Sequence, residues 1–139
     1  ATWPGQKLAI PLASAFVPQS YVASATAGVF APDPVPPGYE DHLGAALTLR
    51  RQTLVANTSQ INALRAELVT MEPRYPTLTL PVELIHGTAD TIVPIDIHSR
   101  PLLRLLPNAN LTTLVGAGHM PHHAHADVVI AAIDRAALR

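Results

Sequence analysis

The chain has 139 residues, about the size of one domain, and 48% of them are apolar while only 14% are charged. This balance indicates much buried surface and argues against a disordered chain. Nine basic residues against ten acidic ones, with no basic run, give no reason to expect a nucleic-acid partner. The absence of cysteine excludes disulfide bonds and thiolate metal sites.

The first 30 residues are largely apolar but interrupted. No basic segment precedes an apolar stretch, so we expect no signal peptide. Residues 8–30 have about the length of a membrane span, but Pro11, Pro18 and Gln19 interrupt them, so we expect an apolar lid or an interface instead. Because the chain does not begin with Met, we expect a processed, truncated or cleaved product.

The middle of the chain predicts helices and no strand. The prolines in residues 31–38 predict an extended loop, because each one pushes the residue before it out of the helical region. A first helix is predicted over Glu40–Ala56, and a second from an N-cap at Ser59 to a stop at Pro73. The second helix carries an apolar stripe that we expect to pack in a core rather than to contact a ligand, formed by Ile61, Leu64, Leu68 and Met71.

Residues 77–139 alternate between strand and helix patterns. Short apolar runs that end at glycine predict buried strands at Val82–His86 and Leu111–Val115. Helices are predicted over Ser99–Leu106, with Asp96 or Ser99 as its cap, and over Asp127–Ala137. The apolar face of the last helix is predicted to hold Val128, Ile130 or Val129, Ile133 and Ala137. This order predicts an α/β fold with parallel strands and a right-handed crossover, although a stable sheet needs further strands.

An acid and a histidine follow the two predicted strands. Asp90 comes four residues after His86, and His119 follows Val115 by the same interval. Because the loops at the carboxyl ends of parallel strands meet at one edge of a sheet, both side chains can converge there. A carboxylate that accepts a hydrogen bond from one imidazole nitrogen orients the ring, and the other nitrogen can then act as a base. The pair favours catalysis over a turn residue and a structural histidine.

Two motifs resemble those of a known family. Residues 86–94 follow the pattern H-G-x-x-D-x-x-V-P, and residues 116–119 read G-A-G-H. These segments resemble the acid-bearing turn and the terminal histidine loop of α/β-hydrolase fold enzymes. The resemblance covers residues 77–137 and implies that Asp90 is the catalytic acid and His119 the base.

The resemblance also implies a division of the chain. Residues 77–139 would be the C-terminal part of the α/β-hydrolase core, with the last two parallel strands of the sheet, and residues 1–76 a mainly helical lid. The chain departs from the family in having no G-x-S-x-G motif and no oxyanion-hole loop. We therefore expect a fragment, bound to a companion chain or N-terminal fragment that carries the nucleophile and the oxyanion hole.

The identity of the nucleophile separates two reaction classes. A serine implies hydrolysis of an ester-type bond through an acyl-enzyme, which we favour. An aspartate implies epoxide or haloalkane hydrolysis through an alkyl-enzyme. The apolar lid implies a small hydrophobic substrate, and its predicted contacts are Trp3, Phe16, Tyr21, Phe30, Val93 and Met120.

The remaining histidines raise a rival interpretation. His119, His122, His123 and His125 lie close together in the sequence, but their spacing matches no known metal-ligand pattern, so we expect neither a metal nor another cofactor. His86 and His98 are expected to be structural or exposed, with His86 near the acid turn. A non-catalytic binding protein is the third class considered. We expect a soluble chain without a membrane span, cytoplasmic rather than secreted.

Overall fold

The computed structural model describes residues 18–44 and 50–138, which form two compact units. Of the described residues, the first unit comprises 18–26, 37–44 and 50–72, and the second comprises 27–36 and 73–138. The second unit thus combines the sheet with a short segment from the region predicted to be a lid.

The described part of the first unit is helical. Helix α2 spans Gln19–Phe30 and continues into the second unit, and α3 spans Tyr39–Leu43. Gly38 and Gly44 flank α3 with φ angles of 76° and 59°. These left-handed conformations suit glycine and set both ends of this short helix. The prediction of one continuous helix over Glu40–Ala56 is therefore wrong, since α3 ends at Leu43.

The long helix α5 spans Arg51–Met71 without a break. The predicted helix start at Ser59 is wrong. At the neighbouring position, the Thr58 hydroxyl donates to the Leu54 carbonyl oxygen at 2.8 Å, so its polar group is satisfied within a continuous helix. The 3₁₀ helix η1, Glu72–Thr77, follows. Pro73 lacks an N–H group, which explains the predicted end of the α-helix.

The predicted apolar stripe of α5 is not packed in a core formed by residues 18–44 and 50–138. The exposed fractions of Ile61, Leu64, Leu68 and Met71 are 62, 53, 42 and 40%. None of the described helices has both the length and the apolar content that crossing a membrane would require.

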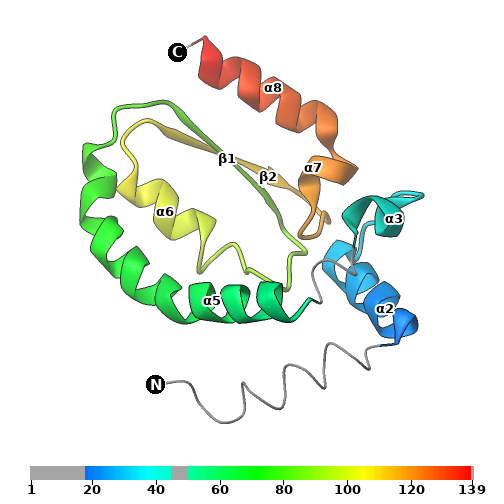
Figure 1. The fold of residues 1–139 in the computed structure, drawn as a ribbon. Coiled ribbons are helices and arrows are strands. Elements are labelled where there is room, and N and C mark those ends of the chain that lie inside the picture. Colours follow the sequence, from blue (N-terminus) through cyan, green and yellow to red (C-terminus); the bar gives the residue numbers. More distant parts are fainter. Residues whose placement is uncertain (1–17, 45–49, 139) are drawn as a thin grey trace. The chain divides into compact units, whose positions relative to one another are not determined.

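The second unit is built on two parallel strands (Figure 1). Strand β1 spans Val82–Gly87 and β2 spans Ala109–Leu114, with a register that pairs Val82 with Ala109 and Gly87 with Leu114. Helix α6, Ser99–Leu105, connects them and packs on both strands. The predicted α/β class, with its parallel pair of strands, is confirmed.

Two helices follow β2. Helix α7 spans Pro121–Ala124, and α8 spans Ala126–Ala137 and packs against β1. In Figure 1, α6 and α8 lie to either side of the two strands. The face of α8 agrees with the prediction in part, because Val128 and Val129, the alternative to Ile130, are covered. Ile133 and Ala137 are exposed against the prediction, and Ala132 and Ala136 complete the covered face.

One ion pair ties α8 to the sheet. The Glu83 carboxylate, only 5% exposed, accepts from the Arg135 guanidinium at 2.9 Å and from the Asn110 side-chain amide at 3.0 Å. Since Glu83 lies opposite Asn110 in the register, the same carboxylate links both strands to the last helix. A buried charge with two such partners avoids the cost of an unpaired one.

Candidate active site at the carboxyl end of the strands

Asp90 lies in a tight turn three residues after the end of β1. Its Oδ1 accepts hydrogen bonds from the backbone N–H groups of Ile92 at 2.9 Å and Val93 at 3.0 Å. The Asp90 N–H in turn donates to the Gly87 carbonyl oxygen at 3.3 Å. Asp90 is 9% exposed. The turn therefore fixes the carboxylate and leaves Oδ2 to face other partners.

His119 meets that second oxygen. Its Nδ1 lies 2.9 Å from Asp90 Oδ2. An ionised carboxylate can only accept a hydrogen bond, so Nδ1 carries the proton and, in the neutral ring, Nε2 is the unprotonated nitrogen. Nε2 has no hydrogen-bond partner among residues 18–44 and 50–138, and the side chain is 31% exposed. The arrangement can therefore accept a proton at Nε2.

Two glycines allow the loops after β1 and β2 to touch. A Cβ atom at Gly87 would overlap the backbone oxygens of Ala117 and Gly118. The Ala89 N–H donates to the Ala117 oxygen at 2.9 Å across the same contact. Gly116 turns the second loop with a φ angle of 79°, a conformation that suits glycine. Close backbone approach therefore brings Asp90 and His119 within hydrogen-bonding distance.

The electrostatics of the turn favour an ionised acid. Burial alone raises the pKa of Asp90. Hydrogen bonds from Val93, His119 and Ile92, together with the attraction of a charged His119, outweigh burial and lower the pKa of Asp90 below its ordinary value of 3.8. The carboxylate is therefore charged at neutral pH and can stabilise a positive charge on His119.

His86, at the end of β1, lies beside the acid as expected. It is 7% exposed, and its Nε2 is 2.9 Å from the Val93 carbonyl oxygen and 3.5 Å from Asp90 Oδ2. Its Nδ1 is 2.6 Å from the Ser99 hydroxyl. The predicted capping role of Ser99 or Asp96 is wrong: His98 precedes α6 without a side-chain cap, and Asp96 instead pairs with Arg100.

A segment distant in sequence holds the histidine loop. The Gly118 N–H donates to Asp33 Oδ2 at 2.7 Å, and a Cβ at Gly118 would overlap the Ala31 and Phe30 carbonyl oxygens. The aromatic ring of Phe30, fully buried, lies 5.5 Å from the His123 ring. The residue before His119 is therefore fixed by the turn at residues 30–33.

Two of the histidines that follow His119 lie side by side. The His122 and His123 rings lie 4.3 Å apart. Burial, followed by repulsion from His123 and His119, lowers the pKa of His122 below its ordinary value of 6.5. Among the described residues no group of three or more potential ligands could hold a metal ion. His122 and His123 are therefore aromatic neighbours of the histidine loop.

The predicted substrate contacts fall in different places. Trp3 and Phe16 lie outside the described residues. Tyr21 is 67% exposed on α2, in the first unit, whereas Phe30 is fully buried in the second. Val93 belongs to the acid turn, and Met120 directly follows His119. The structure thus brings Val93 and Met120 into the neighbourhood of the Asp90–His119 pair and buries Phe30 behind the histidine loop.

The sequence interpretation missed two contributors to the site. The local sequence pattern indicates only a helix cap at Ser99, although Ser99 lies 13 positions from His86 and binds its ring. No local pattern marks Asp33, because its contact with Gly118 spans 85 positions. A signal for Ser99 did exist, since a buried histidine at a strand end needs partners for both ring nitrogens.

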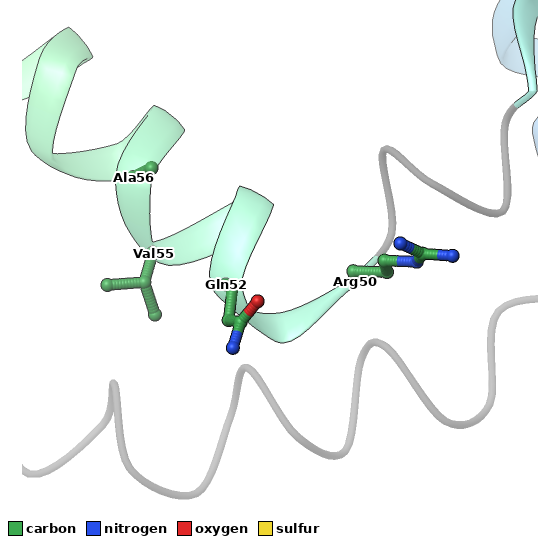
Figure 2. Close-up of a pocket in the computed structure, with 4 residues that line it drawn as sticks. All are labelled: Arg50, Gln52, Val55 and Ala56. Carbon is green, nitrogen blue, oxygen red and sulfur yellow. The ribbon is translucent and has the colours of Figure 1, made fainter.

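A separate hollow lies at the start of α5. It has a volume of about 680 Å³ and is lined by Arg50, Gln52, Val55 and Ala56 (Figure 2). In Figure 2 the four side chains come from the first turns of that helix and from the residue before it. These residues belong to the first unit, whereas Asp90 and His119 belong to the second.

Comparison with known proteins gives similarity without a function. No family model matches the chain. An uncharacterized protein from Mycobacterium bovis and two from strains of Mycobacterium tuberculosis are each 37% identical to it over 60 residues. The match covers 42% of this chain and 17% of each relative. The matched segment therefore makes up a small part of these longer proteins.

Proposed function

We propose that this chain supplies the acid, Asp90, and the base, His119, of an α/β-hydrolase fold enzyme that hydrolyses an ester-type bond in a small hydrophobic substrate. The observation that carries the proposal is the 2.9 Å contact between Asp90 Oδ2 and His119 Nδ1, at the carboxyl end of two parallel strands. The nucleophile and the oxyanion hole would lie in a companion part of the protein.

The proposed chemistry follows from the protonation of the pair. Nδ1 of His119 donates to Asp90, so Nε2 is free to take the proton of a serine hydroxyl as its oxygen attacks the carbonyl carbon of the substrate. The Asp90 carboxylate stabilises the resulting imidazolium. The imidazolium then gives the proton to the leaving alcohol, and a water molecule activated in the same way releases the acid.

The test uses the native assembly, meaning this chain as isolated from its source with any chain that stays bound to it. A fluorophosphonate probe should label the nucleophilic serine, and a panel of acyl esters should be turned over. His119→Ala should lower kcat by several orders of magnitude, because the base is lost. Asp90→Asn should lower it by about 10⁴-fold, as in comparable triads, because the tautomer of His119 is no longer fixed.

Matched control variants distinguish the loss of a catalytic group from a general loss of structure. His98→Gln and Asp134→Asn change an exposed histidine and an exposed acid of the same unit and should leave turnover close to that of the unmodified protein. Nearly unchanged turnover in His119→Ala would contradict the proposal. Turnover of epoxides or haloalkanes without probe labelling would point to an aspartate nucleophile, and no turnover of any substrate would favour a binding role.

A further inference from the structure

His86 is a buried titratable side chain that the proposed chemistry does not use. Its ring contacts the acid turn, and its Nε2 lies 2.9 Å from the Val93 carbonyl oxygen. A carbonyl oxygen can only accept, so Nε2 must carry a proton. In the neutral ring Nδ1 is then an acceptor, and the Ser99 hydroxyl, 2.6 Å away, donates to it.

This assignment places a protonated nitrogen close to the acid, with its hydrogen donated to the Val93 carbonyl oxygen. The protonated Nε2 is also 3.5 Å from Asp90 Oδ2, the same oxygen that binds His119. Val93 is held from both sides, because its N–H donates to Asp90 Oδ1 and its carbonyl oxygen accepts from His86. Moving the His86 ring would therefore disturb both oxygens of the carboxylate.

We propose that His86 is a positioning residue, and that the Ser99–His86–Val93 chain of hydrogen bonds keeps Asp90 Oδ2 aligned with His119 Nδ1. The effect of this alignment on catalysis rests on the proposed function, whereas the alignment of Asp90 with His119 does not. Ser99 orients the His86 ring by its hydrogen bond, and it lies at the start of α6, the helix that connects the two strands. The helix thus contributes to the geometry of a site whose acid and base lie outside it.

The test removes the hydroxyl and keeps the ring. In the native assembly labelled with ¹⁵N-histidine, the ring nitrogen shifts should show His86 as the neutral Nε2–H tautomer. The His119 Nδ1 proton, hydrogen-bonded to Asp90, should give a downfield proton resonance. Ser99→Ala should shift or broaden that resonance, and on the best ester substrate it should lower kcat on the order of tenfold with little change in KM.

Ser99→Thr is the rescue variant, because it keeps the hydroxyl, and it should restore both the resonance and most of kcat. His98→Gln is the control for a change at the neighbouring position. The inference is overturned if His86 carries its proton on Nδ1, if Ser99→Ala leaves the His119 resonance unchanged, or if Ser99→Thr is as defective as Ser99→Ala. Because the resonance is read without substrate, a protein that lacks hydrolase activity would refute the proposed function and still test the alignment.

Discussion

At the scale of single residues, Asp90 makes most of the polar contacts that build the site. Its Oδ1 accepts hydrogen bonds from two backbone N–H groups of its own turn. Its Oδ2 faces the imidazoles of His119 and His86. Donors on both oxygens hold the carboxylate in one orientation and favour its charged form. The partners of one side chain therefore determine both the charge and the direction of the proposed acid.

The pH dependence of stability should reflect this environment. Because folding lowers the pKa of Asp90 below 3.8, the unfolded chain binds more protons than the native one near that pH. The stabilisation is fully present above the unfolded pKa of 3.8 and is lost as the pH falls through the lower folded pKa. Asp90→Asn removes it, so the difference in free energy of unfolding between the two proteins should shrink as the pH falls from about 5.

Urea unfolding of the native assembly at a series of pH values measures this difference. Asp134→Asn, which removes an exposed acid of α8, controls for the loss of one negative charge. A difference between the unmodified protein and Asp90→Asn that stays constant down to the folded pKa would contradict the expected ionisation of Asp90.

At the scale of elements, the sequence predicted the second unit far better than the first. Apolar runs ending in glycine gave both strands within two residues at each end, although the predicted burial is wrong for β2, which has no fully buried residue. The break at Ser59 was predicted wrongly, because a serine or threonine that suits an N-cap can equally lie inside a helix. The exposed stripe of α5 also shows that helical periodicity identifies a face without identifying what covers it.

The site was predictable only where a rule of topology connects distant residues. Parallel register brings the ends of β1 and β2 together, so the meeting of Asp90 and His119 could be expected from their positions. No comparable rule links Asp33 to Gly118 or Ser99 to His86. Their contacts depend on the path of loops and on side-chain packing, which local patterns do not encode.

Two glycines should respond oppositely to the same substitution. Gly118→Ala places a Cβ against backbone oxygens that cannot move aside easily, so it should lower the free energy of unfolding by about 1–3 kcal/mol or more. Gly28→Ala adds a Cβ in open space within α2, and it should raise stability by about 0.4–1 kcal/mol. Thermal unfolding of the native assembly compares them. Equal effects of the two changes would mean that the histidine loop does not lie against residues 30–31.

At the scale of the whole molecule, apolar surface stays uncovered in both units. Large apolar side chains are exposed on α5 and around the sheet, among them Leu80, Ile97, Val115 and Leu138. Exposed apolar side chains of this kind are available for contact with a partner. This exposed surface is consistent with contact to the proposed companion part of the protein. The relatives are also much longer than this chain.

The contact between Asp33 and Gly118 has a consequence for the order of folding. The bonds within the Asp90 turn close loops of two or three positions, the Asp90–His119 contact spans 29, and the Asp33–Gly118 contact spans 85. The entropy lost on closing a loop grows with its length. We therefore expect the acid turn to form early and the anchor of the histidine loop to form last.

Pulse-labelling hydrogen exchange during refolding of the native assembly can follow both events. The Val93 amide should gain protection in an early phase and the Gly118 amide only in the final one. Simultaneous protection of the two amides would contradict this order. If the order holds, a refolding chain acquires its ionised acid before its base is in place, and the last step of folding is also the step that completes the proposed proton-transfer pair.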